Sequence, residues 1–337
     1  MKGIKMGERE EMMAILQKAH AFWETRILLS SAELNIFSPL LDKPKTAAQV
    51  ARELSSNERG TEALLNALTA IGLLVKEKSK FLVKPGFEKF LSSSSSETVL
   101  PLILHMADLW KSWSNLTDIV LKGKEDSGKR RQRDEASLKS FIGAMHAIGS
   151  MMAPNVVSML DLASHKNLID VGGGSGVYTI AALKAAARIR ATIFDLPPVI
   201  ELARQKVVEE NLTDRVTFVK GDFYKDTLPG GHDFALVSAI IHQNSPQQNV
   251  ELFRKIFDAL VPGGTIAIRD YVMTDEHTQP PQGAFFAVNM LLNTPGGGTY
   301  SFEEIKKALE EAGFKKAKLL HEGEMDSLVA AEKPKAT

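Results

Sequence analysis

Four polar side chains that could bind a ligand or move a proton each stand at the end of an apolar run. They are Asp195, Asp222, His242 and Asp270. Apolar runs that alternate with helix-forming segments predict the parallel strands of an α/β sheet, whose ligands bind beyond the carboxyl ends of the strands. The four side chains are therefore expected at one edge, where carboxylates can hold hydroxyl or amino groups and a histidine can accept a proton.

A glycine-rich turn precedes these residues and predicts a cofactor loop. The apolar run Leu168 to Val171 breaks into Gly172 to Gly176, and a helix-forming stretch follows from Val177 to Ala187. A strand, a glycine turn and a helix open many nucleotide-binding domains. Dinucleotide sites have glycine at the first, third and sixth places, but the sixth place here is Val177. The G-x-G-x-G spacing leaves the choice of cofactor to the residues that follow.

Two of the acids are spaced as a nucleoside site requires. Asp195, after the second strand, can accept hydrogen bonds from both ribose hydroxyls, and Asp222, after the third, can accept one from the adenine amino group. Carboxylates repel phosphate, and a ligand without a diphosphate explains the missing sixth-place glycine, because no diphosphate then needs to approach the helix start. S-adenosylmethionine, an adenosyl ligand without phosphates, satisfies both observations. Taken alone, Asp195 could instead cap the helix that follows it.

The elements that position these side chains alternate between strand and helix. Strands are predicted at Leu168 to Val171, Ala191 to Phe194, Val216 to Val219, Phe234 to Ile241 and Ile266 to Ile268. After a helix from Phe302 to Ala312, the stretches Lys318 to Leu320 and Leu328 to Ala331 could form a closing antiparallel hairpin. This order predicts a doubly wound α/β domain.

The beginning of the chain predicts a smaller, mainly helical domain. Apolar residues recur at helical spacing from Glu8 to Ile27, so this helix packs in a core or against a partner subunit. Thr46 and Asn57 stand where they can cap two short helices, and a hairpin around residues 76–80 follows. This is the order of a winged helix. DNA binding is disfavoured because the second helix carries one basic residue, Arg59.

A helical segment connects the two parts. The polar run Ser92 to Ser96 is the expected junction, which gives domains at residues 1–95 and 96–337. Within the second domain, the substrate-pocket segment 99–162 holds an apolar stretch and a basic run at 129–133, which we expect to be a solvated loop. A helix from Ala136 to Leu162 presents aromatic and methionine side chains on one face, for core packing or for a pocket.

Composition limits the classes of function. The chain has 41 Lys and Arg residues and 41 Asp and Glu residues, so it has no basic surplus for binding nucleic acid. The expected partners are small molecules or a second copy of the chain. The absence of cysteine excludes disulfides, thiolate metal sites and cysteine nucleophiles, and fits a reducing cytoplasm. No apolar run reaches the roughly 18 residues that span a bilayer. We therefore expect a cytoplasmic protein without membrane contact.

Several motifs together give nearly the whole chain a family resemblance. They are Asp170 to Gly176, Phe194-Asp195-Leu196-Pro197, Gly221-Asp222-Phe223, Pro262-Gly263-Gly264, Asn289-Met290-Leu291 and Pro295-Gly296-Gly297. On these motifs the chain resembles the class I S-adenosylmethionine-dependent small-molecule O-methyltransferases of plant phenylpropanoid and bacterial pigment or antibiotic pathways. The resemblance implies a Rossmann-like seven-stranded sheet with an antiparallel last strand. It also implies an N-terminal winged-helix domain that forms a homodimer and helps to wall the partner's active site.

The resemblance also implies roles for individual residues. His242 matches the catalytic base, and Asp270 and Thr299 fall where many members have two glutamates. Implied contacts to S-adenosylmethionine, whose product is S-adenosylhomocysteine, come from Asp170, Gly172, Gly174, Gly176, Asp195, Leu196, Asp222, Phe223 and Ser238. Implied substrate contacts come from Trp110, Phe141, Met145 and Met290. Phe285 and Phe286, with Phe141, Met145 and Met290, also predict an apolar, planar acceptor, and Phe286 is counted among the substrate residues. No metal is implied. A histidine suits the reaction because a phenol, with a pKa of about 10, must lose its proton as it attacks the methyl group.

The chain departs from the family pattern around the histidine. Members commonly have His-Asp-Trp where this chain has His242-Gln243-Asn244, and Asp270 and Thr299 replace the two glutamates. One carboxylate raises the pKa of an imidazole less than two do. His242 is therefore predicted to be a weaker base, or to act on a more acidic hydroxyl such as that of a hydroxyquinone. A hydrogen-bonded histidine without a chemical role is the alternative.

The predicted function is transfer of a methyl group to a hydroxyl of a small aromatic molecule by in-line displacement, with His242 as general base. A C- or N-methyltransferase on the same scaffold is an alternative, because only the pocket would differ. A relative that binds the cofactor without transferring a methyl group is a further alternative. A winged-helix regulator with S-adenosylmethionine as effector belongs to a different class, and the neutral charge disfavours it.

Overall fold

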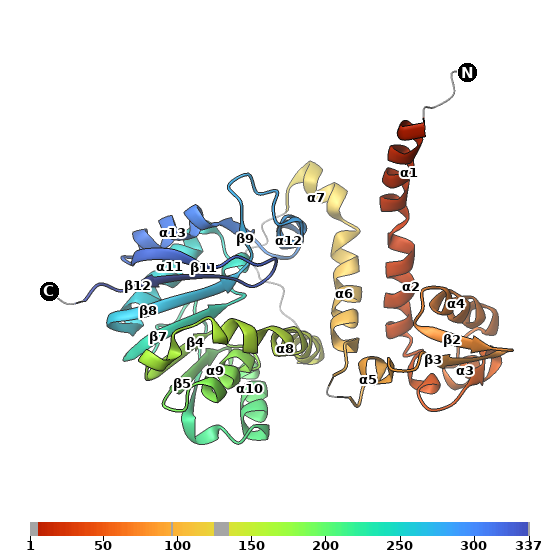
Figure 1. The fold of residues 1–337 in the computed structure, drawn as a ribbon, viewed down its shortest axis with the longest axis horizontal. Coiled ribbons are helices and arrows are strands. Elements are labelled where there is room, and N and C mark those ends of the chain that lie inside the picture. The colour runs from red at the N-terminus through yellow and green to blue at the C-terminus, as the bar shows by residue number, and fades with distance from the viewer. Residues whose placement is uncertain (1–5, 96, 125–134, 336–337) are drawn as a thin grey trace. The chain divides into compact units, whose positions relative to one another are not determined.

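The computed structural model describes residues 6–95, 97–124 and 135–335, and the predicted loop at 129–133 lies outside these residues. The chain forms two compact units, Met1–Trp110 and Lys111–Thr337 (Figure 1). The first unit continues past the polar run at which the sequence predicts a junction. It ends inside helix α6, Leu100–Trp113.

The first unit begins with two helices in place of the single helix expected from Glu8 to Ile27. They are α1, Met6–His20, and α2, Phe22–Glu33. The prediction was wrong at Ala21, where the bond from the Thr25 amide to the Ala21 carbonyl lengthens to 3.5 Å and the Thr25 hydroxyl binds the same carbonyl at 3.3 Å. A threonine that bonds back to the carbonyl four residues earlier weakens the local helix.

The remainder of the first unit has the order expected of a winged helix. Its elements are η1 Ser38–Leu40, β1 Lys45–Thr46, α3 Ala47–Glu53, α4 Glu58–Ala70, β2 Leu74–Glu77, β3 Lys80–Val83 and α5 Glu88–Leu91. The strands pair in the order β1-β3-β2. Thr46 forms the expected capping box with Gln49, and the Asn57 side chain accepts a bond of 2.9 Å from the Gly60 amide. Both predicted caps are confirmed.

The second unit is built on a seven-stranded sheet in the order β11-β12-β8-β7-β4-β5-β6. The strands are β4 Asn167–Val171, β5 Arg190–Asp195, β6 Val216–Lys220, β7 His232–Ser238, β8 Leu260–Asp270, β11 Lys315–His321 and β12 Ser327–Glu332. β12, the last strand, runs antiparallel to β8 and to β11, and the pairs among β8, β7, β4, β5 and β6 are parallel. The predicted Rossmann-like architecture is confirmed.

Helices cover both faces of this sheet (Figure 1). The helices of the second unit that follow α6 are α7 Leu116–Lys122, α8 Glu135–Ser158, α9 Val177–Ala185, α10 Pro197–Glu209, α11 Pro246–Ala259, α12 Pro281–Asn293 and α13 Phe302–Glu311, of which α8, α9, α10, α11 and α13 pack on the sheet. Buried side chains of α11 and α13 pack on one face, and those of α8, α9 and α10 pack on the other. The short strands β9 Val272–Met273 and β10 Tyr300–Ser301 pair with each other beside the sheet.

The strand predicted from Phe234 to Ile241 is shorter than expected. It ends at Ser238, because Ala239 adopts a φ of +57° and turns the chain out of the sheet. The Ala239 amide makes the last bond to the neighbouring strand, at 2.8 Å to the Arg269 carbonyl. His242 therefore lies on a single 3₁₀ turn, η4 Ile241–Gln243, that follows the strand.

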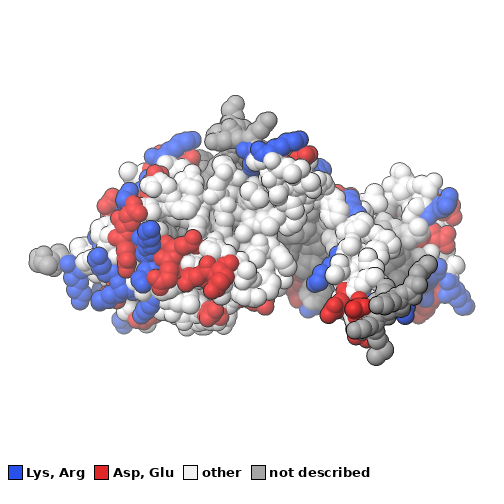
Figure 2. Space-filling model, turned by 90° about the horizontal axis from the view of Figure 1, so that it is seen from above, with Lys and Arg blue, Asp and Glu red and all other residues white. Residues whose placement is uncertain are grey.

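Charged side chains do not form one continuous field of a single sign on the face in Figure 2, where basic groups stand beside acidic ones. This distribution agrees with the equal numbers of acidic and basic residues. Among the described residues, no helix is long and apolar enough to cross a membrane.

Candidate active site

The glycine turn lies between β4 and α9 and leaves space for a ligand. Gly172, Gly174 and Gly176 have φ values of +71°, +58° and +76°, which favour glycine over other residues. A Cβ added to Gly172 would lie 2.5 Å from Cδ1 of Ile240, whereas one added to Gly174 would meet no atom within 4 Å. The turn is therefore closely packed at its first glycine and open at its middle glycine.

Asp195 joins the end of β5 to this turn. Its carboxylate accepts bonds from the Gly174 amide at 2.8 Å and the Leu196 amide at 2.7 Å. Burial raises the pKa of Asp195 to about 6, although both amide bonds favour the charged form. Each carboxylate oxygen has a further lone pair with which to accept a ribose hydroxyl. The Leu196 side chain beside it is exposed.

Asp170, near the end of β4, contacts both the glycine turn and the helix that follows it. Its carboxylate accepts a bond of 2.7 Å from the Thr179 hydroxyl, and a Cβ on Gly173 would lie 2.9 Å from its Cγ. Burial raises the pKa of Asp170 to about 6. Asp170 thus fixes the start of α9 to the strand on which the turn is built.

Asp222 and Phe223 lie beside Asp195 at the same edge. The Gly221 amide binds the Asp195 carbonyl at 3.0 Å, and the Asp222 carboxylate accepts a bond of 3.0 Å from the Tyr224 amide. The Phe223 ring lies 3.5 Å from the position of a Cβ on Gly172. The structure therefore brings the glycine turn, both predicted nucleoside-binding acids and Phe223 together, an arrangement that fits an adenosyl group.

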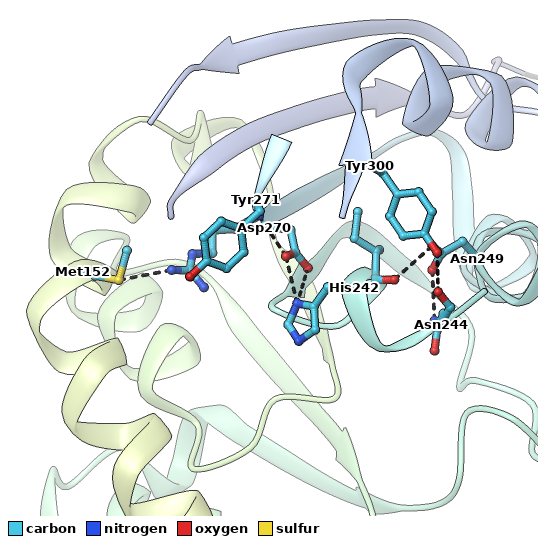
Figure 3. Close-up of polar contacts among 9 residues, drawn as sticks. Met152, His242, Asn244, Asn249, Asp270, Tyr271 and Tyr300 are labelled. Carbon is cyan, nitrogen blue, oxygen red and sulfur yellow. Dashed lines mark hydrogen bonds and ion pairs between the residues drawn. The ribbon is translucent and has the colours of Figure 1, made fainter. Parts of the chain in front are cut away.

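His242 and Asp270 form a close pair (Figure 3). Nδ1 of His242 lies 2.8 and 3.0 Å from the two oxygens of Asp270, whose side chain is 1% exposed. One of these oxygens also accepts a bond of 2.8 Å from the Tyr271 amide. Because an ionised carboxylate only accepts hydrogen bonds, Nδ1 carries a proton and Nε2 of the neutral ring is left with its lone pair.

A buried polar network holds the turn that carries His242, and sequence reasoning missed it (Figure 3). The Asn244 amide group donates to the Asn249 side chain at 3.0 Å, and Asn249 donates to the Ile241 carbonyl at 3.0 Å. The Tyr300 hydroxyl donates to the Asn244 carbonyl. Asn244, which stands where family members have tryptophan, is fully buried. The network fixes the backbone on both sides of the histidine.

Aromatic rings line the site next to the histidine. The Phe286 ring on α12 meets the His242 ring edge-on, with centroids 4.8 Å apart, and stacks on Tyr271 at 4.6 Å. Met290, one turn further along α12, is buried. Of the predicted substrate residues, Phe286 is thus placed directly against the candidate base.

The other predicted residues lie in different surroundings. Phe141 and Met145 are partly buried on α8. Trp110 belongs to the first unit, where the Arg26 guanidinium lies 5.7 Å from its ring centroid. Thr299 is buried, and its hydroxyl has no hydrogen-bond partner among the described residues. Ser238 lies at the end of β7.

His146 of α8 is a second residue that sequence reasoning missed. Its Nδ1 lies 2.9 Å from the hydroxyl of Ser175 in the glycine turn. Burial lowers the pKa of His146, which favours the neutral ring. Its position directly after Met145 was the available signal, because a polar residue in an apolar helix must find a partner. In the described part of the chain, no three His, Asp or Glu side chains are grouped to hold a metal ion.

Comparison with known proteins identifies the family. Residues 113–315 match a family model described as an O-methyltransferase domain, and residues 16–89 match an O-methyltransferase dimerisation domain. The chain belongs to the O-methyltransferase family. The expected family, class of enzyme and cofactor, S-adenosylmethionine, are confirmed.

Similar proteins cover almost the whole chain. The tetracenomycin polyketide synthesis 8-O-methyl transferase TcmO of Streptomyces glaucescens is 28% identical, over 95% of this chain and 96% of its own. An L-tyrosine C(3)-methyltransferase of Streptomyces lavendulae is 28% identical over 91% of this chain and 87% of its own. The solved structure of PigF with SAH, from a family member of Serratia sp., has a TM-score of 0.86 and 25% identity over 95% of this chain and 99% of that one.

Proposed function

We propose that this O-methyltransferase family member transfers a methyl group to a hydroxyl of a small aromatic molecule, with His242 as the general base. The observation that carries the proposal is the bond from Nδ1 of His242 to the buried Asp270 carboxylate, at 2.8 Å. It leaves Nε2 as the proton acceptor, in a ring that Phe286 contacts from α12.

Each residue of the site has a defined task in this proposal. When bound, S-adenosylmethionine supplies an electrophilic methyl group on a sulfonium. The glycine turn, Asp195 and Asp222 hold its adenosyl part. Nε2 of His242 takes the hydroxyl proton as the acceptor oxygen attacks, and Asp270 stabilises the imidazolium that forms.

The larger energetic contribution is expected from positioning. A general base contributes roughly 10²- to 10⁴-fold in rate, whereas alignment of the reacting atoms can supply roughly 7 to 11 kcal/mol. The Phe286 and Tyr271 rings favour a planar acceptor stacked or edge-on beside the histidine. We assign Phe141, Met145 and Met290 to the remainder of the pocket.

Methyl transfer to carbon is the second candidate. The Streptomyces lavendulae relative is named for methylation of a carbon atom of L-tyrosine. On a phenolic acceptor, removal of the hydroxyl proton by His242 would also activate the ring carbon next to the oxygen. After attack through carbon, that ring carbon must lose its proton to water while the oxygen regains the proton from His242, which restores the phenol. The same base can therefore serve both reactions, and the orientation of the ring decides which atom receives the methyl group.

The experiment supplies S-adenosylmethionine with a ¹³C-labelled methyl group and a panel of phenols, naphthols and hydroxyquinones, with anilines included. Carbon NMR of the products distinguishes methyl groups on oxygen, nitrogen and carbon. We expect the label on oxygen. A label on carbon or nitrogen alone, with no methyl ether from any hydroxyl acceptor, would contradict the proposal.

We further propose that residues 1–95 form a homodimer. The match to a dimerisation domain supports this, as do exposed apolar side chains along α1 and α2, among them Met12, Ile15, Phe22 and Trp23. Apolar side chains exposed in this number along two helices are typical of an interface. Light scattering is expected to give twice the mass of one chain, and a monomer mass at micromolar protein would end the proposal.

A further inference from the structure

Arg269 is a buried cation that forms no ion pair with any other described residue. It precedes Asp270 in β8 and is 6% exposed. Within the described residues, no carboxylate oxygen lies within 4.0 Å of its guanidinium nitrogens. One Nη donates to Sδ of Met152 on α8 at 3.1 Å. Nε has no hydrogen-bond partner in the part of the chain that the structure describes. A thioether is a weak acceptor, so this guanidinium is poorly satisfied.

Two further unsatisfied donors lie beside it. Ser238 is the register partner of Arg269 across β7 and β8, so their side chains share one face of the sheet. The Tyr178 ring on α9 lies 5.9 Å from the guanidinium carbon. Arg269 therefore has Ser238 beside it in the sheet and the Tyr178 ring above its guanidinium. Neither hydroxyl reaches a partner in hydrogen-bond geometry among the described residues.

The chemistry of these three groups selects an anion. Arginine stays charged at any physiological pH, and a buried charge without a partner is strongly destabilising. Asp170 and Asp326 act on Tyr178 from further away, but neither is an ion-pair partner of Arg269. One guanidinium nitrogen and two hydroxyl groups are together able to donate three hydrogen bonds. A carboxylate, with two oxygens and about four acceptor sites, matches this set.

The cluster also lies within reach of the reaction. Arg269 is adjacent to Asp270, the partner of His242, and its charge acts on Tyr271, which stacks on Phe286. Met152, which covers the guanidinium, stands seven residues after Met145 on the same helix. Seven residues are about two helical turns, so both side chains share one face of α8. A molecule bound against that face and His242 can therefore extend to Arg269.

We propose that Arg269, Tyr178 and Ser238 form a subsite for the carboxylate of one of the two substrates. The proposal rests on the proposed function only in that a methyl donor and an aromatic acceptor occupy this site. The acceptor could supply the group as an aromatic acid, and the donor could supply it from its amino-acid part. The cluster would then fix one end of that molecule while His242 acts at the other.

Calorimetry with two pairs of probes separates these sources. S-adenosylhomocysteine is compared with 5′-methylthioadenosine, which has no amino-acid carboxylate, and 6-hydroxy-2-naphthoate, whose hydroxyl and carboxylate lie at opposite ends, is compared with its carboxamide. The variant is Arg269→Met, which removes the charge and keeps much of the volume. Arg254→Met is the matched control, because Arg254 pairs with Glu311 at the surface of α11.

We expect Arg269→Met to lower the affinity for one carboxylate-bearing probe at least tenfold, because a charge-assisted hydrogen bond is lost. The affinity for its neutral counterpart should not change. The affected pair identifies the source. The melting temperature of the Arg269→Met protein should not fall below that of the wild type, because the substitution removes a buried and unpaired charge. Equal effects on both members of each pair, or no effect, would overturn the proposal and assign Arg269 a structural role. Neither result depends on methyl transfer, so failure here is distinguishable from failure of the proposed function.

Discussion

Binding of the adenosyl ligand should weaken at acidic pH, because Asp195 must be ionised to accept both ribose hydroxyls. Burial raises the pKa of this carboxyl to about 6, from about 3.9 in an unfolded chain. The charged form is the acceptor, so affinity is present above pH 6 and lost as the pH falls through 6. Between pH 7 and pH 5 the ionised fraction falls from about nine-tenths to about one-tenth. The dissociation constant of S-adenosylhomocysteine should therefore rise about tenfold.

The assay is calorimetry with S-adenosylhomocysteine at pH 7 and pH 5, on the wild type and on Asp195→Asn. The variant should bind roughly tenfold more weakly at pH 7, because a charge-assisted hydrogen bond is lost. The affinity of this variant for S-adenosylhomocysteine should also depend much less on pH. The dependence that remains is attributed to Asp170, whose pKa is also raised to about 6. Asp258→Asn, a change of an exposed aspartate on α11, is the control and should behave as the wild type. Wild-type affinity and an unchanged pH profile in Asp195→Asn would refute the assignment of Asp195 to the ribose.

Three further predictions concern the elements that hold the site. Gly172→Ala should abolish binding of S-adenosylhomocysteine in calorimetry, since its Cβ would lie 2.5 Å from Ile240 at a φ of +71°; retained affinity would contradict the packing of the turn. Tyr300→Phe leaves the buried Asn244 carbonyl without its donor and should lower the free energy of unfolding in urea by about 1–3 kcal/mol. Ser245→Ala removes the capping box of α11 and should cost about 1 kcal/mol in the same assay; no change in either variant would show that these bonds contribute nothing.

The strand ends could be predicted from the sequence because their signal is local. Asp195 directly follows the mainly apolar run Ala191 to Phe194, a single residue separates Asp270 from Ile268, and a polar residue at the carboxyl end of a parallel strand faces the ligand edge. The end of β7 could not be predicted in the same way. Ala239 to Ile241 is as apolar as the strand before it, and only the φ of +57° at Ala239 takes the chain out of the sheet.

The buried polar contacts could not be predicted because they join distant positions. Asn244 and Tyr300 are separated by 56 residues, and nothing local distinguishes a buried asparagine from one in a surface turn. The burial of Arg269 could not be predicted either, because a basic residue near a strand end is ordinarily solvated. The resemblance supplied His242 and Asp270 as a pair, and the structure adds the bond that defines which nitrogen is free.

The most direct test of the central claim is the rate of methyl transfer by His242→Ala, at saturating concentrations of S-adenosylmethionine and of an acceptor that the wild type methylates. Calorimetry on the same preparation measures the affinity for S-adenosylhomocysteine. If His242 removes the acceptor's proton, the rate falls at least tenfold and the affinity is unchanged. Wild-type turnover by His242→Ala would remove this histidine from the mechanism.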